Sequence, residues 1–222
     1  MQLPQPVFSL SVILVTTGVS LLAWKKSNLL ERMLFSTGEI IDNRDYLRLI
    51  SSIFIHANIP HLLFNMFSFY SFAEGIEVQF GYKIIAYIYF YSAIGGSLLS
   101  LIMNRKNREY RALGASGAVC GIIFASIFLL PGGSVYIFLI PFPVPVWAYA
   151  ILFVVISIYG IGSQRGRIGH DAHLGGALTG IIIVLTIKPE ALFENYLLLA
   201  IILIPIIIFF IFKNEIESLL KQ

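Results

Sequence analysis

Long apolar stretches follow one another along almost the whole of this 222-residue chain, and they constrain its fold more than any other feature. An α-helix needs about 20 consecutive apolar residues to cross the hydrocarbon core of a bilayer. A backbone in lipid must satisfy its own hydrogen bonds, and these stretches lack the alternation of barrel strands, so each is predicted to be a helix. The predicted spans are residues 6–24, 60–80, 82–103, 114–131, 144–163, 170–188 and 195–212.

The composition indicates an all-α fold, a polytopic transmembrane helix bundle, and excludes a soluble globule. Hydrophobic residues make up 58% of the chain and charged residues only 12%, whereas soluble domains carry about 25% charged residues. The formal charge is +3, and the basic residues fall in short loops rather than in a stripe with interleaved aromatics. The expected partner is therefore the lipid bilayer, and no nucleic-acid partner is expected.

Polar residues inside membrane spans cost free energy, so each one indicates a structural or functional role. In this chain they gather at the starts of the second, fourth and sixth spans. Because consecutive spans alternate in direction, these three starts share one side of the membrane and a similar shallow depth. The residues concerned are His56, His61, Asn65, Ser116, His170, Asp171 and His173.

Two of these residues, Ser116 and His173, each lie beside a pair of glycines. Small residues four positions apart let two helices approach closely. A serine and a histidine brought together in this way can act as a nucleophile and its general base. The glycine pairs are Gly117 with Gly121 and Gly176 with Gly180.

His61 and Asn65 are four residues apart, which places them on one face of the second span. Their side chains are hydrogen-bond donors, and donors of this kind stabilise the oxyanion that forms during acyl transfer. Together with Ser116 and His173, this pair predicts a serine-based hydrolytic site at the shared side of the bundle.

Three segments resemble the rhomboid family of intramembrane serine proteases, in the family's order and on its second, fourth and sixth helices. They are HANIPHLLFN at 56–65, GASG at 114–117 and AHLGGALTG at 172–180. The resemblance implies a six-helix catalytic core over residues 1–188. The seventh span and a short polar tail, residues 189–222, resemble the additional helix of the family's longer forms.

By this resemblance the chain is an intramembrane serine endopeptidase that cleaves transmembrane segments of other membrane proteins. The family implies a Ser–His dyad rather than a triad, with Ser116 as the nucleophile and His173 as general base and then acid. His61, Asn65 and the backbone N–H of Ser116 would form the oxyanion site. No cofactor and no metal are implied.

The resemblance also bears on how the site is built. Glu77 and Gly81 match a structural glutamate and glycine at the end of the second helix. Cys120 stands where some members carry a tyrosine that stacks on the catalytic histidine. The orientation of His173 must therefore come from other packing.

Two rival interpretations stay open. The four histidines share one face and, with Asp171, could bind zinc, although the HExxH pattern of common zinc proteases is absent. The chain could instead be an inactive rhomboid-like protein that binds transmembrane helices, yet both Ser116 and His173 are present. Outside the zinc interpretation, His56 and His170 are expected to be structural, and Asp171 to be a helix cap or an interface charge.

Access to the site is predicted from two segments. The glycine-rich stretch 160–169 precedes His173 and is expected to form a flexible cap over the site. The fifth span would be the lateral gate, as the family resemblance implies.

Two arguments disagree on the orientation of the chain in the membrane. All of the 15 Lys and Arg residues except Lys83 and Lys188 lie on the side that carries Ser116. The positive-inside rule would turn that side toward the cytoplasm. The family resemblance implies an active site on the extracytoplasmic side of the cell membrane, and we follow the resemblance.

Overall fold

The computed structural model describes residues 6–135, 142–163, 169–213 and 215–216. Within these residues, a long helix occupies each of the predicted spans, and its ends lie within two residues of the predicted ones. The predicted all-α bundle is therefore confirmed. The long helices are α1 (Val7–Lys25), α5 (Ile59–Phe80), α6 (Tyr82–Asn104), α7 (Ser116–Leu129), α8 (Val146–Ser163), α9 (His170–Ile187) and α11 (Tyr196–Ile211).

The apolar composition and the surfaces of these helices are those of a membrane protein. Helices α1, α6 and α9 are each long and apolar enough to cross a membrane. The short helical segment Arg48–Phe54, bent by 98° from α5, makes a fourth candidate with it, whereas α7, α8 and α11 are apolar but shorter. Large apolar side chains cover the outside of the bundle, among them Leu14 with 73% of its surface exposed and Ile211 with 66%. Extensive exposed apolar surface of this kind marks contact with a membrane.

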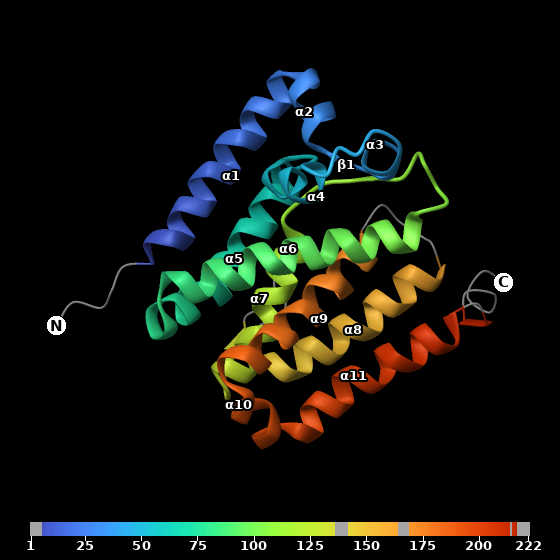
Figure 1. Ribbon diagram of the computed structural model, residues 1–222. Coiled ribbons are helices and arrows are strands. Elements are labelled where there is room, and N and C mark those ends of the chain that lie inside the picture. The colour runs from blue at the N-terminus through green and yellow to red at the C-terminus, as the bar shows by residue number, and fades with distance from the viewer. Residues whose placement is uncertain (1–5, 136–141, 164–168, 214, 217–222) are drawn as a thin grey trace.

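Helix α7 lies at the centre of the bundle, where every residue from Gly117 to Leu129 is buried. It packs chiefly against α9 and α6, and also against α5 and α8. Figure 1 shows α1 at one edge of the bundle beside α5, and α11 running along α8 at the opposite edge. Protein neighbours therefore surround α7, which explains how so short a helix is accommodated.

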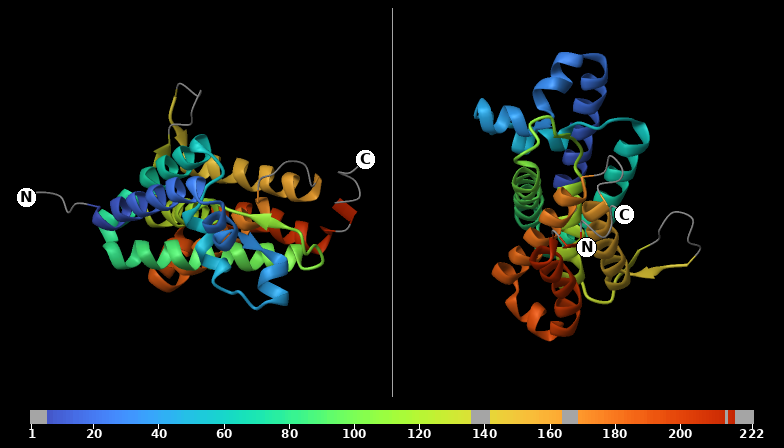
Figure 2. Two further views of the ribbon diagram at one scale, coloured as in Figure 1. Left: turned by 90° about the horizontal axis from the view of Figure 1, so that it is seen from above. Right: turned by 90° about the vertical axis from the view of Figure 1, so that its right-hand side faces the viewer.

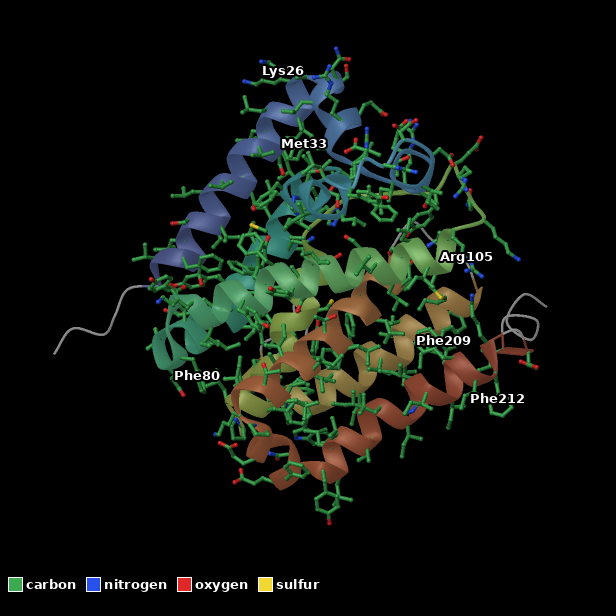
Figure 3. All side chains as sticks on the ribbon, in the orientation of Figure 1. Lys26, Met33, Phe80, Arg105, Phe209 and Phe212 are labelled. Atoms are coloured by element: carbon green, nitrogen blue, oxygen red, sulfur yellow. The ribbon has the colours of Figure 1, made fainter. Side chains whose placement is uncertain are left out.

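Consecutive long helices run in opposite directions, as the sequence predicts. Figure 3 shows Phe80, the last residue of α5, at one end of the bundle, and Arg105, which follows α6, at the other end. Phe212, which follows α11, lies at the same end as Arg105. Helices α5, α7 and α9 consequently begin toward one common side.

The connection between α1 and α5 is structured. Arg48 is buried at its centre and donates hydrogen bonds to the backbone oxygens of Glu31 (2.6 Å) and Leu34 (2.9 Å). It also forms an ion pair of 2.8 Å with Asp45. The elements of this connection are α2 (Ser27–Met33), β1 (Phe35–Ser36), α3 (Thr37–Asp42), α4 (Arg48–Ser51) and the 3-10 helix η1 (Ser52–Phe54).

The described strands are short and lie in the connections between helices. Strand β1 pairs in antiparallel fashion with β2 (Arg111–Ala112), which ties the first connection to the segment just before α7. Strands β3 (Ser134–Val135) and β4 (Val144–Pro145) form a second pair, which stands out from the bundle in Figure 2. A short helix, α10 (Pro189–Glu194), links α9 to α11.

A buried carboxylate joins α5 to the start of α1. Helix α1 has Pro6 at its N-cap, which offers no side-chain acceptor. Glu77 accepts hydrogen bonds from the backbone N–H groups of Phe8 (2.8 Å) and Ser9 (2.9 Å) and from Ser9 Oγ (2.6 Å). It thereby satisfies donors that a helix start leaves unpaired. Gly81, at φ +85°, ends α5 and allows α6 to begin at the next residue.

Candidate active site

The nucleophile candidate is the first residue of the central helix. Helix α7 has 14 residues, which at 1.5 Å per residue makes it about 21 Å long. The hydrocarbon core of a bilayer is about 30 Å thick. Helix α7 is therefore too short to reach both surfaces of a membrane.

The turn before α7 is held from the first connection. Gly114 has φ +114°, a conformation that favours glycine, and its N–H donates to the backbone oxygen of Ser52 (3.0 Å). A side chain at this position would also collide with the His61 ring. The next N–H, that of Ala115, donates to His56 Nε2 (3.3 Å). This turn explains why α7 begins two residues later than the apolar pattern predicts.

The structure brings the two predicted dyad residues together. Ser116 Oγ lies 2.7 Å from His173 Nε2, within hydrogen-bond distance, and the two side chains come from α7 and α9. The backbones of these helices touch along the predicted glycine seam. A methyl group added to Gly176 would overlap the carbonyl of Gly117, and one added to Gly180 would overlap the carbonyl of Gly121.

The other two predicted residues lie beside this pair on α5. His61 and Asn65 line one cavity of about 330 Å³ together with Ser116 and His173. The Asn65 amide is buried and donates to the backbone oxygen of His61 (2.9 Å). Most of the remaining lining is apolar and comes from α5, α7 and α8: Phe64, Val119, Cys120, Ile123, Tyr149 and Phe153. Asn58, Ser68, Leu113 and Gly169 complete it.

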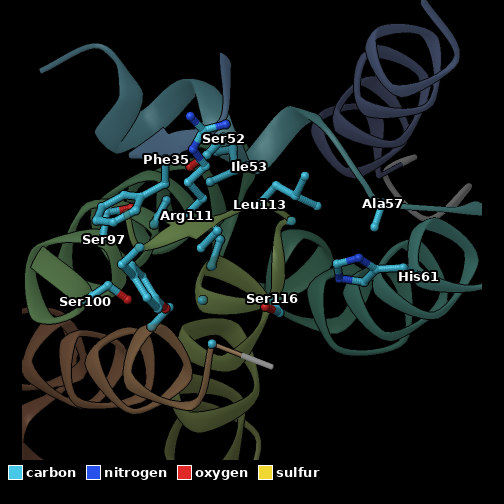
Figure 4. A pocket seen from close by; sticks show the side chains of 18 residues that line it. Phe35, Ser52, Ile53, Ala57, His61, Ser97, Ser100, Arg111, Leu113 and Ser116 are labelled. Atoms are coloured by element: carbon cyan, nitrogen blue, oxygen red, sulfur yellow. The ribbon is translucent and has the colours of Figure 1, made fainter. Parts of the chain in front are cut away.

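A second cavity, of about 350 Å³, reaches Ser116 from the side of α6 (Figure 4). Four hydroxyl groups, those of Ser52, Ser97, Ser100 and Tyr110, contribute to its wall, beside apolar residues such as Phe35, Ile53 and Ala93. The two cavities share Ser116 and His61 in their walls, along with Leu113 and Gly169. The nucleophile candidate therefore stands between an apolar chamber and a chamber with four hydroxyl groups in its wall.

His56 supports the site and does not join the dyad, in agreement with the structural role expected of it. Its Nε2 accepts the N–H of Ala115, so Nδ1 carries the proton and donates to Ser20 Oγ (3.1 Å). Trp24 Nε1 donates to the His56 backbone oxygen (2.7 Å). Burial, and then the neighbouring His61, lower the pKa of His56 to about 3. His56 is therefore neutral at physiological pH, as an acceptor must be.

Ser20 and Trp24 are supporting residues that the sequence did not reveal. Both belong to α1, and their distance from His56 along the chain gives no periodic signal. The only hint in the sequence was the cost of a serine within an apolar span.

Asp171 is buried and does not contact His173 by a hydrogen bond or ion pair. Its carboxylate accepts hydrogen bonds from the Asn104 amide and from Tyr110 Oη (3.2 Å), and its Oδ1 accepts the N–H of Ala172 (2.9 Å). Burial and this carboxylate raise the pKa of Tyr110, which keeps the phenol protonated as a donor. Asp171 thus lies in the first turn of α9 and accepts one N–H there, but the N-cap position is held by Gly169, which offers no side-chain acceptor.

The histidines do not assemble a metal site. His56 and His61 rings meet edge to face at 5.0 Å between centroids, and His170 and His173 meet at 5.9 Å. Throughout the described part of the chain, however, no three His, Cys, Asp or Glu side chains gather where they could hold one ion. The zinc interpretation thus lacks a ligand set among these residues.

Half of the stretch predicted to cover the site lies outside the described residues. Residues 160–163 of the stretch 160–169 belong to α8, which corrects the prediction of a loop there. Residues 164–168 lie outside the described residues.

Comparison with known families bears on the chain from the first connection to the end of α9. The sequence model of the Rhomboid domain matches residues 43–190, two thirds of the chain, including every residue of the candidate site. The chain belongs to the rhomboid family. The resemblance seen in the three motifs is therefore confirmed.

Individual rhomboid relatives come from several kingdoms. Rhomboid protein 1, mitochondrial, of Saccharomyces cerevisiae is 31% identical over 137 residues, 60% of this chain and 40% of that protein. RHOMBOID-like protein 5 of Arabidopsis thaliana is 31% identical over 181 residues, 80% of this chain and 54% of that protein. Rhomboid protease GluP of Bacillus subtilis is 26% identical over 176 residues, 78% of this chain and 32% of that protein. This rhomboid spans about half or less of the length of these relatives.

Proposed function

We propose that this rhomboid is an intramembrane serine endopeptidase that cleaves transmembrane segments of membrane proteins. The observation that carries the proposal is the 2.7 Å contact between Ser116 Oγ and His173 Nε2, at the point where two cavities meet. A serine hydroxyl is a weak nucleophile until a neighbouring base takes its proton. Family membership and the protease among the relatives support the same activity.

In the proposed reaction, Ser116 Oγ attacks the scissile carbonyl carbon while its proton passes to His173 Nε2. The C–N bond then breaks, the departing amine takes that proton, and an acyl ester remains on Ser116. Water, deprotonated by His173, attacks the ester carbonyl, and the proton returns to Ser116 Oγ as the carboxylic product leaves. His173 thus serves as base and then as acid in each half of the reaction.

The oxyanion formed in each half is proposed to be held at the start of α7. The first N–H groups of a helix have no acceptor within it and carry partial positive charge. His56 already accepts the N–H of Ala115, which leaves the N–H of Ser116 for the oxyanion. His61 and Asn65, which line the same cavity, complete the proposed donor set. Loss of one such donor in other enzymes costs about 3 kcal/mol of transition-state stabilisation.

The two cavities suit different reactants. The apolar chamber between α5 and α8 matches the side chains of a transmembrane segment, and the chamber with four hydroxyl groups in its wall matches water. A helical substrate has its carbonyls engaged in hydrogen bonds, so it must unwind locally before Ser116 reaches one. We therefore propose substrates with small or helix-breaking residues near the cut.

A serine-reactive fluorophosphonate tests the proposal against the two rivals. The purified protein, reconstituted in liposomes with a generic transmembrane substrate, is expected to cleave the substrate, and labelling of Ser116 is expected to abolish cleavage. A chelator is expected to leave the rate unchanged. Loss of activity with the chelator, without labelling, would support the zinc enzyme. Absence of both labelling and cleavage would support the inactive helix-binding protein.

The extent and placement of the catalytic unit also belong to the proposal. We propose residues 1–188 as the catalytic core, because every residue of the site lies within them, and residues 189–222 as an addition, of which α11 packs on α8. We further propose that the active site faces the extracytoplasmic side of the cell membrane. Relatives named as mitochondrial do not favour that particular membrane.

Tags at the two ends of the chain test this orientation. With seven spans, an extracytoplasmic site puts the N-terminus inside the cell and the C-terminus outside. Protease added to intact cells is therefore expected to remove a C-terminal tag and spare an N-terminal one. The reverse pattern would show that the distribution of Lys and Arg decides the orientation.

A further inference from the structure

The His173 imidazole is oriented by few polar contacts. Its Nε2 meets Ser116 Oγ, and no group in the described part of the chain forms a hydrogen bond with its Nδ1. A single hydrogen bond leaves an imidazole free to swing about that bond. The plane of the ring must therefore be set by what packs against its faces and edges.

Two aromatic rings pack against it. The Phe153 ring of α8 lies with its centroid 5.6 Å from that of His173 and its plane tilted by 36°. The His170 ring meets His173 edge to face at 5.9 Å and 77°. His170 lies one turn earlier on the same helix, α9, so it moves together with His173. It therefore cannot fix the position of the His173 ring relative to Ser116 on α7. Phe153 comes from a different helix.

Phe153 is itself held by α7, the helix that carries Ser116. Its ring packs edge to face on Phe124 of α7, with 5.8 Å between centroids, and it also contacts Tyr149 of α8 at 6.3 Å. Phe124 is completely buried in the core. One turn after Ser116, α7 presents Val119 and the small side chain of Cys120 to the same cavity, and neither carries a ring. The ring contacts from Phe124 to Phe153 and from Phe153 to His173 therefore fix the imidazole relative to α7, the helix that carries Ser116.

We propose that Phe153 is a positioning residue, whose ring keeps the His173 imidazole in the plane where Nε2 faces Ser116 Oγ. The proposal rests on the proposed serine-protease function and adds to it the packing that replaces a hydrogen bond on Nδ1. A misplacement of about 1 Å in a catalytic group costs about 100-fold in rate. Loss of the ring is expected to have an effect of that kind without removing any reacting group.

The proposal competes with a simpler one, in which Phe153 is only a wall of the apolar chamber. A wall contacts the substrate, so its removal would raise KM for a transmembrane substrate and leave a small reagent unaffected. A positioning residue acts on Ser116 through His173. Its removal lowers kcat and also slows labelling of Ser116 by a fluorophosphonate.

The experiment compares Phe153→Ala, Phe153→Tyr and the control Leu152→Ala in the full chain, reconstituted in liposomes. Leu152 is the adjacent residue of α8, and its side chain is exposed on the outside of the bundle. Labelling rate, kcat and KM are measured, with thermal unfolding as the check on folding. Phe153→Ala is expected to slow labelling and lower kcat by about tenfold to 100-fold. Phe153→Tyr, which keeps the ring, and Leu152→Ala are expected to stay within about twofold of the wild type.

Each outcome decides the proposal. Wild-type labelling and kcat in Phe153→Ala, with or without a raised KM, would overturn it and leave Phe153 as a wall. If Phe153→Ala does not fold, Phe153→Leu carries the same test, because it retains apolar volume but lacks the ring. Failure of the wild-type protein to be labelled or to cleave would overturn the proposed function instead, so the two failures are distinguishable.

Discussion

Replacing Ser116 with alanine is expected to abolish cleavage of a transmembrane substrate and labelling by fluorophosphonates. In soluble serine proteases, loss of the nucleophile costs about a million-fold in kcat. The same result is expected for His173→Ala, since Ser116 Oγ hydrogen-bonds its Nε2 and would lose its base. Cleavage is measured by the appearance of product fragments in liposomes.

The control for Ser116→Ala is a comparison of its thermal stability with that of the wild type. Its hydroxyl contacts His173 alone among the hydrogen bonds of the described residues, and removing one neutral hydrogen bond changes the free energy of unfolding by about 1 kcal/mol. Ser116→Ala should therefore fold and unfold thermally much as the wild type does. Cleavage that survives in this well-folded variant would mean that another group attacks the peptide bond.

Replacing Gly176 with alanine is expected to lower the activity by about 100-fold, although this residue touches no reacting atom. A methyl group there would overlap the backbone carbonyl of Gly117, the residue after the nucleophile. Helices α7 and α9 must then separate, which costs roughly 1–3 kcal/mol of stability for overpacking. The separation also pulls His173 from Ser116, and a displacement of about 1 Å costs about 100-fold in rate.

The matched control for this prediction is Gly18→Ala in α1. The chemical change is the same, but a methyl group at Gly18 meets no atom within 4 Å. Because alanine favours helix by about 1 kcal/mol over glycine, this variant should be as stable as the wild type or more so, with full labelling. Labelling and thermal unfolding are measured for both variants. Wild-type labelling of Gly176→Ala would show that the seam does not set the dyad distance.

The helices were predictable because a membrane restricts the sequence so strongly. An apolar run of about 20 residues without alternation forms a helix in lipid. Because successive helices alternate in direction, His61, Ser116 and His173 then lie toward one side. The seam between α7 and α9 was predictable as well, from glycines at a spacing of four. The start of α7 shifted by two residues because Gly114 and Ala115 serve the turn.

Contacts between side chains from distant segments were not predictable. Nothing in their spacing connects Phe153 to His173, Ser20 to His56 or Asn104 to Asp171. Each contact depends on how the helices rotate about their axes, and an all-round apolar helix leaves that rotation undetermined. From the sequence it followed only that Cys120 cannot stack on the His173 ring as a tyrosine would, so that another residue must orient this ring. The roles of the four site residues, the extent of the core and the orientation stay predictions.

Helix α1 is fastened at both of its ends, by Glu77 at the first turn and by the His56 contacts of Ser20 and Trp24 near the last. Yet the stretch by which the family is recognised starts at residue 43, after α1 has ended. A chain trimmed to that stretch would keep every proposed catalytic group and lose the brace behind the turn that presents the nucleophile. The contacts that support the nucleophile's turn therefore extend beyond the segment that the family's sequence model matches.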